Sequence, residues 1–416
     1  MTTNLYIFNQ TRRGAVFGVG TYIRELTAAL KESDINICVV NLISEKSQIQ
    51  TEDIDGIKHW YFPLAISDQR TTSNDKQWEL YFRNIVYLLR LHIEDKKNLI
   101  FHLNFHQNIS LVEELKNAFD CRIVSAVHFT DWGFTVFDNL PRLRNILNEE
   151  YPDSFDENVK KAFEEEILYY AKVDHVICLS DYMKEILCLD YGLDETKISV
   201  IPNGLEDNGE LNIENGESTK GALRKKWNIL HWEKIILFVG RIDEVKGVIY
   251  LIRAFREIIK KNQAFRLIIA GSGDYDKCFQ KAKGICSKIT FTGLLAKEDL
   301  HEIYQIADVG VVPSLFEPFG YVPVEMMMHK LPIVATATSG INEVVDNTCG
   351  LKIPLIMLPD RVEIDTMLLA EKILYLLRHP IEAKQMGKNG RKRYLNNYSS
   401  KIFRRNMLQI YKSMCK

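Results

Sequence analysis

Short apolar runs alternate with longer stretches in which apolar residues recur every three or four positions along most of this chain. The short runs are rich in β-branched residues and predict buried strands, whereas the longer stretches predict amphipathic helices. Residues 99–103 and 234–239 exemplify the strands, and residues 77–92 and 248–260 the helices. Strands that alternate with helices are typical of doubly wound parallel sheets. We therefore predict an α/β fold.

One segment interrupts this alternation. Residues 205–221 are rich in Gly, Asn and Glu and have almost no apolar periodicity, which is the composition of a linker. We therefore predict one domain over residues 1–205, a linker over 206–221 and a second domain over 222–395. Residues 384–405 predict a basic helical stretch, whose end belongs to a C-terminal helix over 396–416.

Bulk composition limits the function classes. The 416 residues are 46% hydrophobic and 26% charged, which is ordinary for a globular protein with sizeable cores. The formal net charge of −2 gives no overall field that would favour nucleic acid as a partner. The eight cysteines include no C-x-x-C pair, which favours reduced thiols over a zinc site. With no signal-peptide pattern and no run of 18 apolar residues, we expect a cytoplasmic protein.

Two acids flank the start of a predicted helix in the second domain. Glu317 lies in the loop after the apolar run 309–313, and Glu325 lies about one turn inside the next helix. Ligands of open α/β sheets bind at this end of the strands, and helix N-termini favour anions. Two acids beside an anion site suit a ligand with phosphates and several hydroxyls. The alternative is a loop acid and an acid that complements the helix dipole.

Other loops after predicted strands carry groups suited to phosphate. Arg241 and Lys246 follow the strand 234–239, where both can converge on one diphosphate, although a solvated turn remains the alternative. Gly18 and Gly20, and Gly271 and Gly273, lie in glycine loops between strands and helices, where backbone N–H groups can approach phosphate. A tight turn explains such glycines equally well.

Three histidines of the first domain are candidates for chemistry. His128 ends the strand 122–127, where it can donate to a ligand hydroxyl or phosphate and titrate near neutrality; the alternative is a packed strand end. His102 and His106 stand four residues apart but have no evident third ligand. The neighbouring Asn104 and Asn108 favour a polar loop over a metal site.

These motifs resemble a known family. The run from Ser314 to Glu325 contains Pro318-Phe319-Gly320 and ends in Pro323-Val324-Glu325. It is similar to the E-x7-E signature of retaining glycosyltransferases of family four, which have the GT-B fold. The loops at residues 18–26, 240–247 and 271–273, together with His128, follow in the order of that family.

The resemblance implies two Rossmann-like domains that face each other across a cleft, with the last helix crossing back to the first domain. The activity implied is transfer of a hexose or N-acetylhexosamine from a nucleotide sugar, most simply a UDP-sugar, to an acceptor hydroxyl. Arg241 and Lys246 would bind the diphosphate, and Glu325 the ribose. Glu317 and the backbone of Phe319 and Gly320 would hold the sugar. The remaining donor contacts implied are Gly18, Gly20, Gly240, Gly271, Gly273, Leu294 and Tyr321, and His128 lies near the sugar's 6-position.

The resemblance also limits the cofactors and partners that we expect. Aspartate pairs at Asp53–Asp55 and Asp274–Asp276 lack the context of a GT-A metal site, so we predict no metal and no cofactor. Trp132 and Phe134 are candidate acceptor contacts, with core packing as the alternative. We expect a surface polysaccharide or glycolipid acceptor, with peripheral contact of a basic helix with the membrane as one option. The alternatives are a peptide or small-molecule acceptor, a GT-B nucleotide-sugar epimerase, or a non-catalytic nucleotide- or sugar-binding module.

Overall fold

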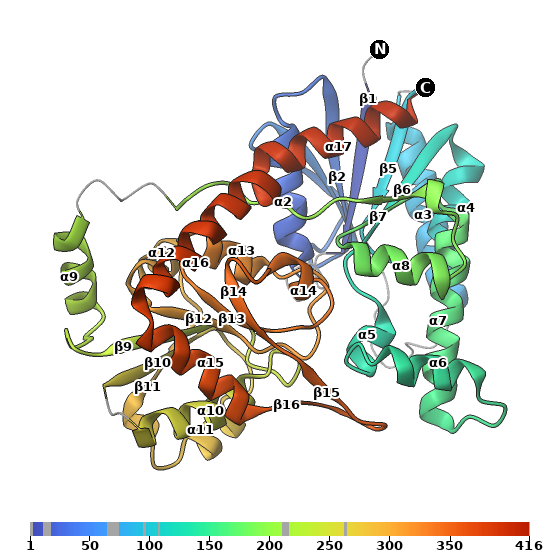
Figure 1. Ribbon diagram of the computed structural model, residues 1–416. Coiled ribbons are helices and arrows are strands. Elements are labelled where there is room, and N and C mark those ends of the chain that lie inside the picture. The colour runs from blue at the N-terminus through green and yellow to red at the C-terminus, as the bar shows by residue number, and fades with distance from the viewer. Residues whose placement is uncertain are drawn as a thin grey trace. The chain divides into compact units, whose positions relative to one another are not determined.

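The computed structural model describes residues 3–10, 18–64, 75–94, 97–106, 109–209, 216–261 and 264–415. Internal contacts divide the chain into two compact units (Figure 1). The first unit comprises Met1–Thr130, Pro152–Gly204 and Ser400–Lys416, and the second comprises Asp131–Tyr151 and Leu205–Ser399.

The first unit is built on an eight-stranded sheet in the order β3-β4-β2-β1-β5-β6-β7-β8. Its neighbouring strands are parallel except for β3, which pairs antiparallel with β4 at the edge. The chain moves outward from β1 in one direction and from β5 in the other, so the topological switch lies between these strands. The strands are β1 (Thr3–Gln10), β2 (Ile35–Ser44), β3 (Gln50–Ile54), β4 (Ile57–Pro63), β5 (Leu99–Leu103), β6 (Cys121–Val127), β7 (His175–Cys178) and β8 (Ile198–Val200).

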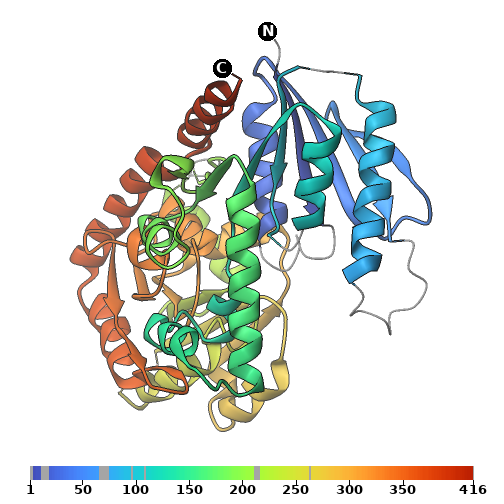
Figure 2. The same ribbon diagram turned by 90° about the vertical axis from the view of Figure 1, so that its right-hand side faces the viewer.

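Helices cover this sheet. α17 packs beside α2, while α3 packs beside α4, and α4 in turn contacts α7 (Figure 2). The helix α17 comes from the far end of the chain, so the first unit is completed only by its last residues. The helices are α2 (Val19–Leu30), α3 (Asp75–His92), α4 (Ile109–Ala118), α7 (Ser154–Lys172), α8 (Asp181–Leu189) and α17 (Ser400–Met414), with a 3₁₀ turn at Glu195–Lys197.

The second unit is built on a six-stranded parallel sheet in the order β11-β10-β9-β12-β13-β14. Here the topological switch lies between β9 and β12. A two-stranded antiparallel ribbon, β15-β16, follows the sheet. The strands are β9 (Lys234–Val239), β10 (Phe265–Ala270), β11 (Ile289–Gly293), β12 (Val309–Val312), β13 (Ile333–Thr336), β14 (Gly350–Ile353), β15 (Leu355–Met357) and β16 (Val362–Ile364).

Among the helices of this unit, α10 shows how the sequence sets the packing. Leu251, Phe255 and Ile258 recur at helical spacing and are fully buried, in a core that α15 also lines. Each such side chain contributes about 1.5–3 kcal/mol of burial free energy. The helices are α5 (Asp131–Thr135), α6 (Leu140–Asn148), α9 (Gly216–Lys226), α10 (Val248–Lys261), α11 (Tyr275–Ala282), α12 (Lys297–Ile306), α13 (Tyr321–Met328), α14 (Ile341–Val344), α15 (Thr366–Arg378) and α16 (Pro380–Arg393), with a 3₁₀ turn at Cys286–Lys288 and a π turn at Tyr394–Tyr398.

The division into units differs from the sequence expectation at residues 131–151, which were assigned to the first domain and belong to the second unit. Specific hydrogen bonds hold this segment there. Ser339 Oγ donates to Asp138 Oδ2 at 2.6 Å, and Asn139 Nδ2 donates to the Leu358 carbonyl at 2.9 Å. Arg142 donates to the Asp360 carbonyl at 2.7 Å. These partners lie about two hundred residues away in sequence, beyond the reach of any local pattern.

The predicted linker also differs. Residues 216–226 form α9, and the described start of the segment is fixed rather than loose. Arg391, buried in the second unit, makes a bidentate pair with Asp207 through nitrogen–oxygen distances of 2.7 and 2.6 Å. Residues 210–215 lie outside the described part of the chain.

The basic stretch 384–405 is not one helix. α16 ends at Arg393, the π turn follows, Ser399 is extended, and α17 begins at the next residue. Arg393 donates to Asp346 at 2.6 Å within the second unit, whereas Arg404 donates to the Glu32 carbonyl at 2.8 Å within the first. Part of the predicted basic face is thus used in separate internal contacts.

Candidate functional site

The topological switch of the second unit brings two predicted loops together. The loop after β9 carries Arg241 and Lys246, and the loop after β12 carries Glu317. The Leu315 N–H donates to the Val245 carbonyl at 2.7 Å, which ties the two loops directly. Since ligands of doubly wound sheets bind at this crevice, the geometry favours a site here.

Lys246 and Glu317 are in contact although they stand 71 positions apart: Lys246 Nζ donates to Glu317 Oε2. Both side chains are largely buried, at 20% and 19% exposure. Asp243 organises the same loop, because it accepts from the Lys246 N–H at 3.0 Å and lies 3.1 Å from Arg241 Nη2. The cluster therefore holds two cations and two acids, which lie on the loops after β9 and β12.

The glycine loop after β10 has a structural reason for its composition. Gly271 has a φ of 147°, and a Cβ there would lie 1.8 Å from the Gly240 carbonyl oxygen. The two loops are hydrogen-bonded: the Ile242 N–H donates to the Ser272 carbonyl, and the Asp274 N–H to the Ile242 carbonyl, both at 2.8 Å. Gly273 pairs with Ile242 in an isolated bridge. The glycines therefore allow the backbone of this loop to lie in contact with the loop after β9, which carries Arg241.

Gly320 sets the start of α13. Gly320 is the N-cap with a φ of 96°, a conformation that favours glycine. Phe319 is buried and packs edge-on against Tyr321 and Tyr398, with ring centroids 5.5 and 5.8 Å away. Leu294, which follows β11, is 79% exposed and free to make apolar contact with a ligand.

Glu325 accepts hydrogen bonds through both its side chain and its backbone carbonyl. The Tyr304 hydroxyl, carried by the neighbouring α12, donates to Glu325 Oε2 at 2.7 Å. His329 Nδ1 donates to the Glu325 carbonyl at 2.8 Å, because a carbonyl can only accept, and His301 Nδ1 lies 2.9 Å from His329 Nε2. Burial lowers the pKa of His329 to about 4, so this ring is neutral at physiological pH. Burial and the Glu325 charge raise the pKa of Tyr304, which keeps its proton for the donated bond.

The aspartate pairs flagged in the sequence have local roles. Asp274 caps α11 by accepting from the Lys277 N–H at 3.3 Å. Asp53 accepts from the Gly56 N–H at 2.9 Å in the turn between β3 and β4. Asp274 and Asp53 thus make a capping and a turn hydrogen bond, respectively.

In the first unit, helix α2 begins within the predicted glycine loop. Gly18, with a φ of 74°, is the N-cap of α2, and Gly20 lies within the first helical turn. The described backbone therefore presents the start of α2, a suitable position for an anion, beside the end of β1.

His128 follows β6 as predicted, but it does not titrate near neutrality. Its side chain is buried, and burial together with the nearby His102 lowers its pKa to about 3. His128 Nε2 lies 2.8 Å from Asn104 Oδ1, and Asn104 Nδ2 donates to the Phe8 carbonyl at 2.9 Å. The imidazole is therefore neutral and held by a residue that the sequence assigned to a polar loop.

His102 links three elements of the first unit. Its Nε2 lies 3.3 Å from the hydroxyl of Tyr22 on α2, and its Nδ1 lies 2.9 Å from the hydroxyl of Tyr411 on α17. Burial lowers the pKa of His102 to about 3. The Tyr22 ring also packs edge-on against His128, with centroids 4.5 Å apart.

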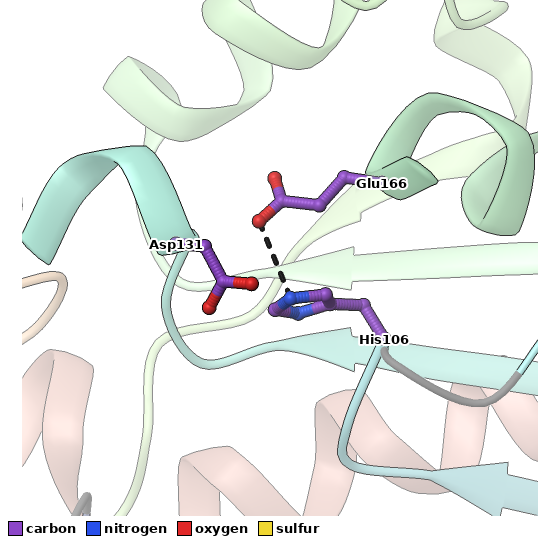
Figure 3. Close-up of side chains that lie close together, drawn as sticks. All are labelled: His106, Asp131 and Glu166. Atoms are coloured by element: carbon purple, nitrogen blue, oxygen red, sulfur yellow. Dashed lines mark ion pairs between the residues drawn. The ribbon is translucent and has the colours of Figure 1, made fainter. Parts of the chain in front are cut away.

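His106 has a different environment from His102. Its Nε2 lies 3.3 Å from Glu166 Oε1, as Figure 3 shows, and the Tyr191 hydroxyl donates to the other oxygen of Glu166. Asp131, drawn in the same figure, is the first residue assigned to the second unit. Because both ring nitrogens of His102 are engaged by tyrosines, the two histidines do not form one ligand pair.

The candidate acceptor residues lie in α5. Trp132 is 1% exposed, and Phe134 packs edge-on against Phe316 with ring centroids 5.0 Å apart, both within the second unit. The turn at Thr338 and Ser339 belongs to the same unit, and Thr338 Oγ1 donates to the Leu315 carbonyl at 2.9 Å. The packing alternative accounts for Trp132, and its role toward an acceptor stays a prediction.

Two family models match the chain, one in each half. The model for glycosyl transferases group 1 matches residues 219–393, which carry the Arg241, Lys246 and Glu317 cluster. The model for glycosyltransferase family 4 matches residues 16–208. Each model covers less than half of the chain, and both halves are thus similar to glycosyltransferase domains.

Curated proteins and solved structures are also similar to this chain. An uncharacterised glycosyltransferase of Methanocaldococcus jannaschii is 38% identical over 175 residues, which are 41% of this chain and 44% of that protein. The chain spans about half the length of the first curated relatives that it matches. Sucrose-phosphate synthase from Thermosynechococcus elongatus superposes with a TM-score of 0.74 at 20% identity, covering 99% of this chain and 98% of that one. Anabaena HepE, solved in complex with UDP-glucose, has a TM-score of 0.73 at 15% identity and covers 99% of each chain.

These structural neighbours confirm the predicted GT-B fold. In the described parts of the chain, every helix is too short or too polar to cross a membrane. Sequence reasoning missed Asn104 and Tyr304 as partners of site residues. Asn104 follows β5 directly, at the carboxyl end of a central strand, and that position was the available signal.

Proposed function

We propose that this protein transfers a hexose or N-acetylhexosamine from a nucleotide sugar to an acceptor hydroxyl. The observation that carries the proposal is the contact of Lys246 with Glu317 at the topological switch of the second unit, beside Arg241. A diphosphate competes with Glu317 for the Lys246 ammonium, and Arg241 adds a planar fork suited to phosphate oxygens. Glu317, once released, is an acceptor for sugar hydroxyls.

The proposed roles follow from this exchange. Arg241 and Lys246 offset the charge that develops on the departing nucleoside diphosphate, in place of a metal ion. Glu325 holds the ribose, and Glu317 with the Phe319–Gly320 backbone holds the sugar. We propose retention by same-face attack, in which the leaving phosphate takes the acceptor proton.

Supporting observations point to the donor and acceptor classes. The UDP-glucose complex of the structural neighbour HepE favours UDP as the nucleotide to test first. We propose a polysaccharide or glycolipid acceptor, because a capsular polysaccharide glycosyltransferase of Staphylococcus aureus is 26% identical over 256 residues. A lipid-linked acceptor would bring peripheral contact with a membrane.

The test is calorimetric binding of UDP, GDP and ADP to wild type, to Lys246→Ala and to Lys260→Ala, without added metal. Lys260 is a matched control, since it is an exposed lysine on α10 that pairs only with Glu257 in the described structure. We expect one nucleotide to bind wild type and Lys260→Ala equally. Loss of a charged hydrogen bond should weaken binding to Lys246→Ala by about 1.5–3 kcal/mol.

Two results would contradict the proposal. If no nucleotide binds wild type, the chain has the fold without a donor site. If donor is consumed at the same rate with and without acceptor and a free sugar isomer accumulates, the enzyme is an epimerase and not a transferase.

A further inference from the structure

Two histidines of the second unit are in contact although they stand 28 positions apart. His301 lies on α12 and His329 follows α13, and His301 Nδ1 lies 2.9 Å from His329 Nε2. The centroids of the two rings are 4.9 Å apart, and the ring planes are tilted by 31°. Neither histidine lies on the loops after β9 and β12 that carry the proposed diphosphate site. The pair is therefore a separate cluster of nitrogen ligands.

Hydrogen bonds fix which nitrogen of His329 is available. His329 Nδ1 lies 2.8 Å from the Glu325 carbonyl, which can only accept, so Nδ1 carries the proton. In the neutral ring, Nε2 then has a lone pair, and this nitrogen faces His301. A ring N–H that is donated to a backbone carbonyl is typical of histidines that bind a metal through the other nitrogen. The backbone of α13 thus orients His329 as a ligand.

A carboxylate lies one helical turn before His301. Glu298 and His301 form a Glu-x-x-His pair on α12, and residues three apart lie on the same side of a helix. Burial lowers the pKa of His301, and the charge of Glu298 acts in the opposite direction, so the carboxylate is near the ring. Glu298 is exposed and has no hydrogen bond or ion pair with a described residue. Its side chain can therefore turn toward a ligand of His301.

We infer that Glu298, His301 and His329 form a binding site for a divalent transition-metal ion such as Zn²⁺, which joins α12 to the end of α13. Zn²⁺ takes imidazole and carboxylate ligands, and water can fill a fourth position. Glu-x-x-His pairs on helices are used as metal ligands in helical bundles. Mg²⁺ and Ca²⁺ favour all-oxygen sites, so they fit this ligand set poorly.

The geometry of the histidine pair suits this ion. Zn–N bonds of about 2.0–2.1 Å at a tetrahedral angle place two ligand nitrogens about 3.3 Å apart. The observed separation of 2.9 Å therefore has to open only slightly, which a small rotation of the partly exposed His301 side chain provides.

Binding of the ion changes the tautomer of one ring. In the structure, His301 Nδ1–H donates to His329 Nε2, because that nitrogen has no proton. When Nδ1 binds the ion, its proton is lost and Nε2 of the same ring takes one up from water, so His301 stays neutral and no net proton is released. His329 keeps its N–H and its hydrogen bond to the Glu325 carbonyl. The prediction that the diphosphate needs no metal is unaffected.

The first experiment titrates Zn²⁺ into the full chain, free of any affinity tag, by calorimetry. We expect one saturable site in wild type. His301→Gln and His329→Gln should each weaken this site by at least about ten- to a hundredfold, since even the loss of a residue that only supports a ligand has an effect of that size. Glu298→Gln should weaken it less, by about tenfold, because the charge is lost and two nitrogens remain.

His379→Gln is the matched control. His379 also belongs to the second unit, and its Nδ1 lies 2.8 Å from the carbonyl of Tyr375, four positions earlier, as His329 Nδ1 does from Glu325. Among the described residues, no second histidine contacts it. His379→Gln should therefore leave the affinity for Zn²⁺ unchanged.

A second measurement separates metal binding from a structural role of the histidine pair. Cu²⁺ binds nitrogen sites more tightly than Zn²⁺, and its paramagnetic resonance spectrum is split by each coordinated nitrogen. We expect two nitrogens in wild type and one in His301→Gln. Zn²⁺ should also raise the unfolding temperature of wild type but not that of His301→Gln. A pair that only packs α12 against α13 would change stability without changing either readout.

The inference is overturned if wild type has no saturable site for Zn²⁺, or if His301→Gln and His379→Gln affect the affinity equally. A copper spectrum that is the same in wild type and His301→Gln would overturn it as well, since the ion would then be bound elsewhere. Nucleotide binding is a separate outcome: its failure would contradict the proposed function and leave this inference unchanged.

Discussion

The polar cluster described in the second unit is charged, whereas the cluster around His102 and His128 in the first unit is neutral. In the second unit, Lys246 and Glu317 are charged groups that meet at the switch of the sheet, and Glu325 is held by a donated hydroxyl. In the first unit, His102 and His128 are buried and neutral, and their hydrogen bonds run to tyrosine hydroxyls and an amide. Both units are parallel sheets covered by helices, so the fold does not decide this difference.

The comparison teaches that burial sets the chemistry available to each unit. The Lys246–Glu317 pair keeps about a fifth of each side chain exposed, so charge can be exchanged with a ligand. His102 and His128 of the first unit are buried away from solvent, and burial favours their uncharged forms. We therefore expect ligand binding at the Lys246–Glu317 pair of the second unit to depend on charge.

The largest expected effect is acid destabilisation of the first unit. The pKa of His102 and that of His128 are about 3 in the folded chain, against 6.5 in the unfolded chain. The unfolded state therefore binds protons first, and the unfolding free energy falls as the pH drops below about 6.5. Each histidine should contribute up to about 1.4 kcal/mol per pH unit until the pH nears 3. Urea titrations at a series of pH values measure the slope.

The same titrations on His128→Asn provide the control. Removing His128 should reduce the slope by about 1.4 kcal/mol per pH unit, which is the contribution of one proton. An unchanged slope would mean that this ring is not neutral in the folded state, and the contrast between the units would fail there.

The next effect concerns the connection of α17 to the first unit. Tyr411→Phe removes the hydroxyl that pairs with His102 Nδ1 and leaves a buried nitrogen without its partner. We expect a loss of about 1–3 kcal/mol in unfolding free energy, measured by urea denaturation. Tyr87→Phe, on an exposed tyrosine of α3, should change it by less than about 0.5 kcal/mol. Equal effects of the two variants would contradict the buried network.

A smaller effect is expected in the second unit. Tyr304→Phe removes the hydrogen bond to Glu325 while the charge of Glu325 remains, so nucleotide binding should weaken by about 1 kcal/mol. The loss should disappear with a 2′,3′-dideoxynucleotide if Glu325 holds the ribose. Tyr375→Phe is matched, because its hydroxyl bonds to Glu382 at the surface of the same unit. Calorimetry on both variants with both nucleotides decides whether Tyr304 positions Glu325.

Salt gives the smallest and most general test. Raising the ionic strength from about 0.1 M to about 0.5 M should weaken nucleotide binding several-fold, because charge attraction at the partly exposed Lys246 and Arg241 is screened. Nucleotide binding that does not respond to salt would contradict a charged contact of the ligand with Lys246 and Arg241.

The sequence by itself determined much of the local structure. The strands at 99–103 and 234–239 have the predicted bounds, and α10 ends one residue beyond its predicted end. Hydrophobic periodicity over a few residues is enough for such elements. The Arg241, Lys246 and Glu317 motif was also readable, because its residues lie in loops whose position after strands follows from the pattern.

Only the tertiary structure decided how those residues behave. The neutral state of His128 depends on Tyr22, His102 and Asn104, which come from other elements. The position of the His102 side chain depends in turn on Tyr411 at the far end of the chain. The assignment of residues 131–151 to the second unit likewise depends on partners about two hundred positions away. Protonation and packing are set by neighbours in space, and sequence patterns report neighbours along the chain.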